Sequence, residues 1–163
     1  MNFRIGYGYD VHAFKEGGEF WLGGIKISHS KGCLAHSDGD VLIHAICDAI
    51  LGAAALRDIG YQFPDNSVEF KNIDSKILLK RTHELLKQKH YKIANIDSTI
   101  SLQQPKINNY IPEMIKVLAA VLELDEDQVS VKATTTEGLG FEGREEGLSA
   151  LATVLIYKDD SID

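Results

Sequence analysis

Three residues, Asp10, His12 and His44, offer side chains that together could bind a metal ion. Asp10 and His12 are two positions apart in a stretch expected to be extended, so their side chains point to the same face. His44 lies where a loop is expected to run into a helix. Two imidazoles and one carboxylate suit zinc, and three protein ligands leave a fourth position for water or substrate. The pattern predicts a reactive metal site, although a single histidine in a helix is more often structural.

Two carboxylates flank His44 on the same face of the expected helix. Asp40 and Asp48 are each four residues from His44, a spacing that places side chains side by side. Either carboxylate could orient the second ring nitrogen of His44, as neighbours of metal-bound imidazoles commonly do. Asp40 is equally suited to cap the helix, and Asp48 to remain solvated. Both interpretations stay open at this point.

A threonine-rich segment, Lys132–Phe141, lies at the end of an expected strand. Its hydroxyl and backbone donors suit phosphate oxygens, and Glu137 is a hard oxygen ligand for magnesium or manganese. A flexible turn explains the same composition equally well. Two further segments, around Asp58–Gly60 and Gln103–Lys106, are turns by default that could contact sugar hydroxyls and a phosphate.

The elements that must position these residues follow from hydrophobic periodicity and turn residues. The pattern predicts an α+β (mixed α/β) fold, with a mixed sheet and helices on one face, as a single domain over residues 1–163. The first three strands are expected to form a β-meander. Strands are predicted at Arg4–Phe14, Phe20–Leu22, Ile25–Ile27, Ile93–Leu102, Val129–Ala133 and Leu148–Tyr157, and helices at about Asp40–Ala55, from Asp74–Ser75 onward, and near Asn108–Leu122.

Composition excludes several classes of function. The net charge is -7, with 24 acidic and 17 basic residues, which gives no general attraction to nucleic acid or to an anionic membrane. No apolar run approaches the length of a membrane span and no signal peptide is visible, so a soluble, cytoplasmic protein is expected. Cys33 and Cys47 form no C-x-x-C pair and are expected to be reduced, Cys47 as a small buried apolar residue.

Taken together, these segments resemble the 2-C-methyl-D-erythritol 2,4-cyclodiphosphate synthase family of the non-mevalonate isoprenoid pathway. The motifs occur in the family's order and cover nearly the whole chain. The matching residues are Gly6-x-Gly8-x-Asp10-x-His12, Ala35-His36-Ser37-Asp38-Gly39-Asp40-Val41 with His44-Ala45 and Asp48-Ala49, Asp58-Ile59-Gly60 with Phe63-Pro64-Asp65, Pro105-Lys106, and Lys132-Ala133-Thr134-Thr135-Thr136-Glu137 with Gly140-Phe141-x-Gly143-Arg144.

The resemblance implies a metal-dependent phosphorus–oxygen lyase that acts on a 2-phosphorylated cytidine diphosphate of methylerythritol. The substrate's 2-phosphate attacks the β-phosphorus and expels cytidine monophosphate. A homotrimer with active sites between neighbouring subunits is also implied. The implied roles are zinc ligands for Asp10, His12 and His44, a second divalent ion (Mg²⁺ or Mn²⁺) at Glu137 with the substrate phosphates, and transition-state stabilisation for His36 and Thr135.

The same resemblance implies two groups of substrate contacts. Phe141 and Arg144 border the substrate or the central channel of the trimer. The contacts to the methylerythritol phosphate are Asp10, His12, His36, Ser37, Asp58, Ile59, Gly60, Phe63, Pro64, Asp65, Asn66 and Ser67. The contacts to the cytidine diphosphate are Leu102, Gln103, Gln104, Pro105, Lys106, Ile107, Asn108, Thr134, Thr135, Thr136 and Glu137.

Two alternatives from other functional classes remain open on the residues alone. One is a zinc-dependent phosphoester or diphosphate hydrolase, in which the metal activates water and Asp38 or Asp65 acts as the base. The other is a non-enzymatic trimeric binding module in which zinc only stabilises the fold. The reaction product separates the first alternative from a cyclase, and metal removal separates the second.

Overall fold

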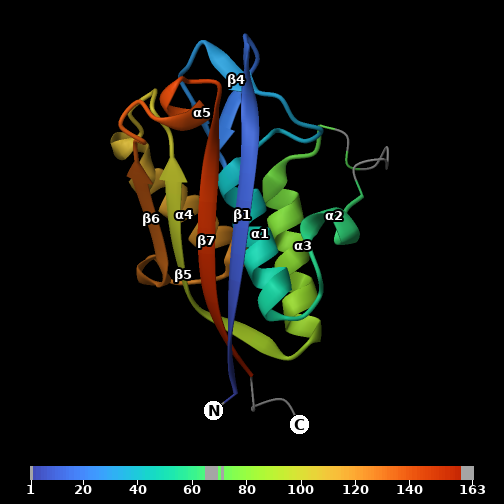
Figure 1. Ribbon diagram of the computed structural model, residues 1–163. Helices are drawn as coiled ribbons and strands as arrows, with labels where there is room; N and C mark the ends of the chain where they lie inside the picture. The colour runs from blue at the N-terminus through green and yellow to red at the C-terminus, as the bar shows by residue number, and fades with distance from the viewer. Residues whose placement is uncertain (1, 65–69, 71, 159–163) are drawn as a thin grey trace.

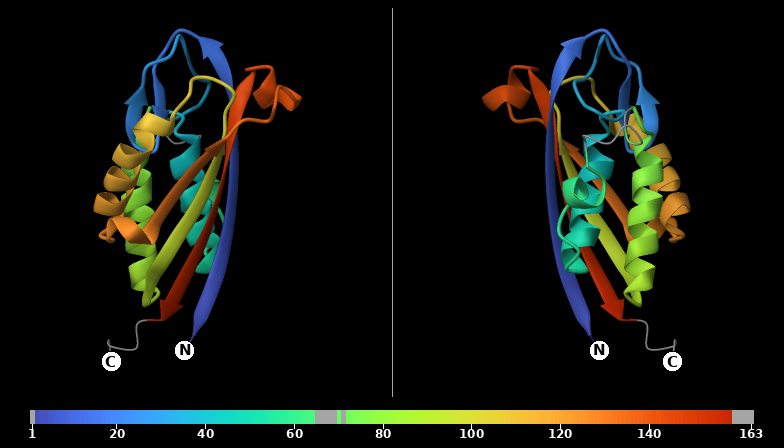
Figure 2. Two further views of the ribbon diagram at one scale, coloured as in Figure 1. Left: turned by 90° about the vertical axis from the view of Figure 1, so that its left-hand side faces the viewer. Right: turned by 90° about the vertical axis from the view of Figure 1, so that its right-hand side faces the viewer.

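A five-stranded mixed sheet forms the centre of the molecule, with the long helices on one face (Figures 1 and 2). The computed structural model describes residues 2–64, 70 and 72–158. The strand order is β4-β1-β7-β5-β6. All neighbouring pairs are antiparallel except β5 and β6, which run parallel. The strands are β1 (Phe3–Glu16), β4 (Lys31–Cys33), β5 (Tyr91–Ser101), β6 (Val129–Thr134) and β7 (Gly147–Lys158).

The three long helices are α1 (Val41–Ala53), α3 (Ser75–Gln88) and α4 (Ile111–Leu122). Two of them begin after an aspartate whose carboxylate accepts a hydrogen bond from the first helical turn: Asp40 precedes α1 and Asp74 precedes α3. Such caps satisfy backbone N–H groups that the helix itself leaves unpaired. The short elements are α2 (Ile59–Gln62), α5 (Gly140–Gly143) and two 3₁₀ turns at Asn108–Tyr110 and Glu126–Gln128.

Helix α1 lies directly against β1, and glycine makes this close approach possible. A Cβ atom on Gly8 would lie 2.7 Å from the backbone nitrogen of Ala49 and closer still to the carbonyl oxygen of Ala45. Gly6 meets the next turn of the helix in the same way. Nearly every residue of α1 is buried. The backbones of β1 and α1 therefore approach at a distance that a larger residue would prevent.

The predicted α+β fold, with a mixed sheet and helices on one face, is confirmed, but the predicted β-meander is wrong. Strands β2 (Phe20–Leu22) and β3 (Ile25–Ile27) form a separate two-stranded sheet. Strand β1 pairs instead with β4 and along nearly its full length with β7, from Phe3↔Tyr157 to Ala13↔Gly147. The long strand at the opposite end of the sequence offers more backbone pairing than a three-residue neighbour.

The remaining expected strands and helices are present, with shifted ends. Three short elements were not predicted: β4, α2 and α5, the last within the expected turn region Thr134–Gly147. Within the described residues, no helix is long and apolar enough to cross a membrane.

Candidate metal centre and substrate cavities

The side chains of Asp10, His12 and His44 converge at one point between β1 and α1. His44 Nδ1 lies 3.0 Å from Asp10 Oδ2 and 3.1 Å from His12 Nε2, and His12 Nε2 lies 3.2 Å from Asp10 Oδ2. Three ligands on a tetrahedral zinc ion with bonds of about 2.0–2.1 Å would be roughly 3.3 Å apart. The triangle of potential ligand atoms therefore fits a small divalent ion closely, and it confirms the predicted grouping of these residues.

The strand and the helix that carry the three ligands direct their side chains to this point. Asp10 and His12 follow Gly6 and Gly8 at every second residue of β1, on the strand face that contacts α1. His44 lies in the first turn of α1. All three side chains retain some solvent exposure, 25% for Asp10, 16% for His12 and 11% for His44. A bound ion would thus keep one side open toward solvent or substrate.

The two histidines differ in their affinity for protons. Burial lowers the pKa of His12, and the charge of Asp10 only partly opposes this. Burial also acts to lower the pKa of His44, but the hydrogen bond and the charge of Asp10 outweigh it, so this pKa is raised. A proton on His44 Nδ1 competes with a metal ion for the same electron pair.

The second ring nitrogen of His44 is held by serines. His44 Nε2 lies 3.0 Å from Ser75 Oγ and 3.2 Å from Ser37 Oγ. Ser75 is the first residue of α3 and is fully buried. Sequence reasoning missed Ser75, because its position after Asp74 resembles an ordinary helix start.

The carboxylates expected to orient His44 have other partners. Asp40 is fully buried and accepts hydrogen bonds from the backbone nitrogens of Gly23, Gly24 and Ile43. It caps α1 and ties the β2–β3 turn to it. The capping interpretation of Asp40 is thereby confirmed.

The carboxylate of Asp48 accepts a hydrogen bond from the backbone nitrogen of Ile59 at 2.7 Å. It therefore secures α2 to α1. The prediction that it is merely solvated is wrong, and the hydrogen bonds of the described residues assign the second nitrogen of His44 to serines instead.

A cavity of about 280 Å³ opens beside the metal triad. Two triad residues, His12 and His44, line it together with several residues expected to contact the methylerythritol phosphate. Asp58 and Pro64, which were also expected at the substrate, are not among the residues that line this cavity. Asp58 instead caps α2 by accepting a hydrogen bond from the backbone nitrogen of Tyr61. The expected contacts Asp65, Asn66 and Ser67 lie outside the described residues. The predicted residues that line this cavity are His12, His36, Ser37, His44, Ile59, Gly60 and Phe63.

A second cavity, of about 180 Å³, lies at the ends of β5 and β6. Its lining combines the polar residues Lys106 and Asn108 with the apolar residues Leu102 and Ile107. Among the described residues, no side chain lines both this cavity and the one beside the triad. The residues expected at the cytidine diphosphate that line it are Leu102, Pro105, Lys106, Ile107, Asn108, Thr134 and Thr135.

The threonine-rich loop after β6 arranges its own polar groups. The hydroxyl of Thr135 donates to Glu137 Oε1 at 2.9 Å, and the hydroxyl of Thr136 donates to the carbonyl oxygen of Leu139 at 2.6 Å. The backbone nitrogen of Gly138 lies 3.4 Å from the side-chain oxygen of Gln103. Glu137 is exposed, so its carboxylate is accessible to a ligand from outside the chain.

The loop continues into α5, which lies beyond the open face of the sheet, on the side away from the helices (Figure 2). Phe141 belongs to α5, and Arg144 follows it and pairs with Glu146 at 3.0 Å. Gln104 precedes Pro105 in a cis peptide bond. Within one chain, the loop that leads to α5 therefore extends to the open face of the sheet, whereas the metal triad lies on the helical face.

The fold and the Asp-His-His group define an α+β protein with a candidate site for a divalent metal ion. The chain belongs to the YgbB family, whose pattern matches residues 3–157. It is 63% identical over 158 residues to the 2-C-methyl-D-erythritol 2,4-cyclodiphosphate synthase of Bacteroides fragilis, covering 97% of this chain and 99% of that protein. The synthase of Syntrophomonas wolfei is 54% identical over 153 residues, covering 94% of this chain and 98% of that protein.

Solved structures show the same fold. The CDP complex of IspF from Plasmodium falciparum has a TM-score of 0.86 at 39% identity, covering 98% of both chains. The bifunctional IspDF of Campylobacter jejuni has a TM-score of 0.93 at 43% identity over 96% of this chain. The present chain spans 42% of that bifunctional protein.

Proposed function

We propose that this chain converts 4-diphosphocytidyl-2-C-methyl-D-erythritol 2-phosphate to 2-C-methyl-D-erythritol 2,4-cyclodiphosphate and releases cytidine monophosphate. The family membership and the names of relatives that are 60–63% identical establish the activity as that of a cyclodiphosphate synthase, a lyase of the non-mevalonate isoprenoid pathway. The hydrolase alternative finds no support among these relatives. The observation in this chain that carries the proposal is the convergence of Asp10, His12 and His44 beside a cavity.

The chemistry asks the protein to position groups rather than to supply a nucleophile, because the substrate's own 2-phosphate attacks the β-phosphorus. Its two anionic groups repel one another and must be held in line. A divalent ion bound by the triad, which we propose to be zinc, supplies positive charge to phosphate oxygens. His36 and Ser37, which line the same cavity, are proposed to donate hydrogen bonds to the phosphates or to the methylerythritol.

Glu137 and Thr135 are proposed to act at the diphosphate. The Thr135 hydroxyl orients the Glu137 carboxylate, and an exposed, oriented carboxylate suits Mg²⁺ or Mn²⁺, which keeps several waters and binds phosphates. Thr135 also lines the second cavity. We assign the transition-state contacts to His36 and Thr135, and the cytidine to the cavity that contains Lys106.

A homotrimer with active sites between subunits is proposed on two grounds. First, strand β1 carries a row of large apolar side chains, 42–73% exposed, on the sheet face away from the helices, and such a contiguous patch is typical of a protein interface. The row comprises Phe3, Ile5, Tyr7, Tyr9 and Val11.

Second, the triad and the cytidine cavity are separated within one chain. Strands β7 and β5 lie between β1 and β6, and three strand spacings amount to roughly 14 Å. The Glu137 loop leads to α5 on the open face (Figure 2), whereas His44 lies in the helical layer. A neighbouring chain packed on the open face would bring its own loop toward this chain's triad.

Two further assignments complete the proposal. Residues 1–163 are taken as one cyclodiphosphate synthase domain, supported by the family match over residues 3–157. The cytoplasmic location expected from the sequence stays a prediction. Sedimentation equilibrium tests the trimer: the expected mass is three times the 18.0 kDa of one chain, and a stable monomer would contradict the proposed shared site.

Product analysis by mass spectrometry, with the cytidine diphosphate substrate, zinc and magnesium, tests the reaction. Cytidine monophosphate and a cyclic diphosphate are expected, whereas release of inorganic phosphate would refute cyclisation. His44→Ala should lose bound zinc and activity together, and Glu137→Ala should keep zinc but lose turnover. The matched control is Glu84→Ala, which removes an exposed carboxylate on α3 and should change neither.

A further inference from the structure

The imidazole nitrogen of His44 that faces away from Asp10 and His12 joins a partly buried chain of hydrogen bonds. His44 Nε2 lies 3.0 Å from Ser75 Oγ, and the Ser75 hydroxyl in turn donates to Asp38 Oδ1. Ser75 has no exposed surface. The chain of groups Asp38–Ser75–His44 thus links the start of α3 to the imidazole of α1.

The direction of these hydrogen bonds follows from the chemistry of the groups. An ionised carboxylate only accepts hydrogen bonds, so the single proton of the Ser75 hydroxyl points to Asp38. Ser75 Oγ must then accept a hydrogen bond from His44, which requires the proton of a neutral imidazole to reside on Nε2. With Nε2 protonated in this way, the electron pair of His44 Nδ1 is free for a metal ion once that ion displaces the proton that Nδ1 shares with the Asp10 carboxylate, 3.0 Å away.

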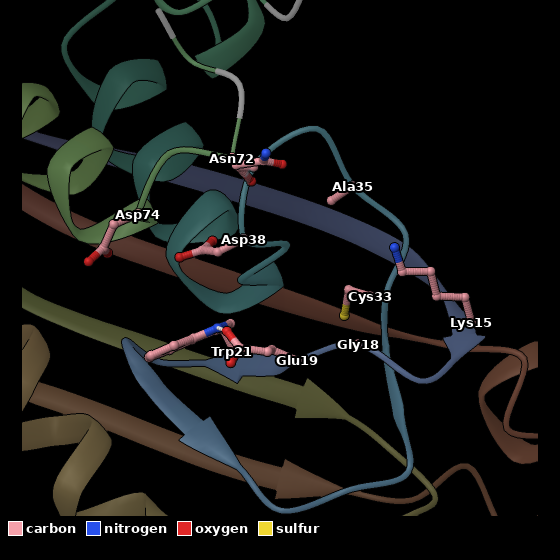
Figure 3. Close-up of a pocket in the computed structure, with 10 residues that line it drawn as sticks. Lys15, Gly18, Glu19, Trp21, Cys33, Ala35, Asp38, Asn72 and Asp74 are labelled. Atoms are coloured by element: carbon pink, nitrogen blue, oxygen red, sulfur yellow. Dashed lines mark hydrogen bonds between the residues drawn. The ribbon is translucent and has the colours of Figure 1, made fainter.

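Asp38 is itself fixed in place. Its Oδ2 accepts a hydrogen bond from the Ser75 backbone nitrogen at 2.8 Å, and its Oδ1 accepts one from the Asp40 backbone nitrogen at 3.2 Å. Asp38 also lines a separate cavity of about 390 Å³, together with Trp21 and Asp74 (Figure 3). Asp38 is not among the residues that line the cavity beside the triad, so its carboxylate acts on His44 through Ser75.

We infer that Ser75 and Asp38 are positioning residues that hold His44 in the tautomer able to bind the metal. The inference rests on the metal-dependent function proposed above and extends it to two residues outside the ligand set. Ser37 also lies 3.2 Å from His44 Nε2, and its oxygen accepts a hydrogen bond from the Gly39 backbone nitrogen, but no hydrogen bond within the described residues links its hydroxyl to a carboxylate. Ser75 alone joins the ring to a carboxylate among the hydrogen bonds described for this nitrogen.

The test measures metal binding rather than turnover. Metal-free protein is titrated with Co²⁺, followed by its visible absorption, and with Zn²⁺ against a competing chelator. Ser75→Ala should weaken binding by about 10–100-fold, the usual effect of losing such a partner, and should alter the cobalt spectrum. Ser75→Thr keeps the hydroxyl and should restore both. Asp38→Ala should also weaken binding, because Ser75 is then free to donate to His44.

Asp74→Ala is the matched control. Asp74 precedes Ser75 and caps α3, and its carboxylate pairs with Lys76 at 2.9 Å. Its removal should lower stability and leave metal affinity unchanged. Equal affinity and an unchanged cobalt spectrum in Ser75→Ala would overturn the inference, whereas a wild-type chain that binds neither ion would refute the proposed metal centre itself.

A second measurement decides the matter if Ser75→Ala fails to fold. Nitrogen NMR of labelled histidine in Zn²⁺-loaded wild-type protein shows whether the His44 Nε2–H takes part in a hydrogen bond. A slowly exchanging, hydrogen-bonded Nε2–H is expected for His44. An Nε2–H that exchanges as fast as that of an exposed imidazole would overturn the inference without any variant.

Discussion

Replacement of Gly8 by alanine should damage the metal centre although Gly8 supplies no ligand. A Cβ atom at this position would lie 2.7 Å from the Ala49 nitrogen and closer still to the Ala45 carbonyl oxygen. Ordinary contacts begin near 3.4 Å. Strand β1 must therefore move from α1 by at least about 0.7 Å before the methyl group fits.

This displacement is large for a metal site. Asp10 and His12 move with β1, while His44 stays with α1, and ligand distances must usually hold to within about 0.2 Å. We expect a loss of metal affinity of at least about 100-fold, because Asp10 and His12 both move away from His44. Overpacking of the interface should also cost about 1–3 kcal/mol, or about 2–12 °C in melting temperature for a chain of this size.

Gly52→Ala is the matched control for this experiment. Gly52 lies on α1, the helix that packs against Gly8, but a Cβ atom on it would meet only the Tyr7 carbonyl oxygen, at 4.0 Å. Alanine is favoured over glycine inside a helix by about 0.5–1 kcal/mol, so stability should be equal or higher and metal affinity unchanged. The assays are thermal unfolding of metal-free protein and chelator competition for zinc. Wild-type melting and affinity in Gly8→Ala would refute the argument that glycine sets the ligand geometry.

Three other outcomes are expected. Asp10 raises the pKa of His44 above the ordinary histidine value of 6.5. Below that raised pKa, protons compete with zinc for His44, and zinc affinity should fall about tenfold per pH unit. An affinity that does not change with pH in competition titrations would contradict this. Asp40→Ala leaves three backbone N–H groups without their acceptor and should lower the free energy of unfolding by about 3–5 kcal/mol, measured in urea. Burial raises the pKa of the Cys33 and Cys47 thiols to about 12, so neither should react with iodoacetamide until the protein unfolds.

The long elements were predictable because each carries its own signal. The alternation in Val129–Ala133 and the helical spacing in α3 and α4 are local patterns that tertiary contacts then reinforce. Strand β4 and helices α2 and α5 have three or four residues each, too few for a period to appear. The partner of β1 was also out of reach, because pairing with β7 joins opposite ends of the chain.

The metal triad was predictable because residue type and strand geometry sufficed for Asp10 and His12, and a helix start for His44. The hydrogen-bond partners of the second ring nitrogen of His44 could not be predicted from the sequence. A four-residue spacing correctly puts Asp40 and Asp48 on its side of the helix, but it does not state where the imidazole ring turns. Ser75 reaches this ring only because α3 begins beside α1, an arrangement that depends on the packing of the whole helical layer.

The pairing of β1 with β7 also has a consequence for the order of events during synthesis. Asp10 and His12 leave the ribosome first, yet the strand that carries them is bordered over most of its length by residues 147–157, which are made almost last. Until β7 emerges, β1 lacks its main hydrogen-bonding neighbour, and its two ligands have no fixed relation to His44. We therefore expect the ion to be acquired by the finished polypeptide and not by the nascent chain, so that a message truncated before β7 yields a product without a metal centre.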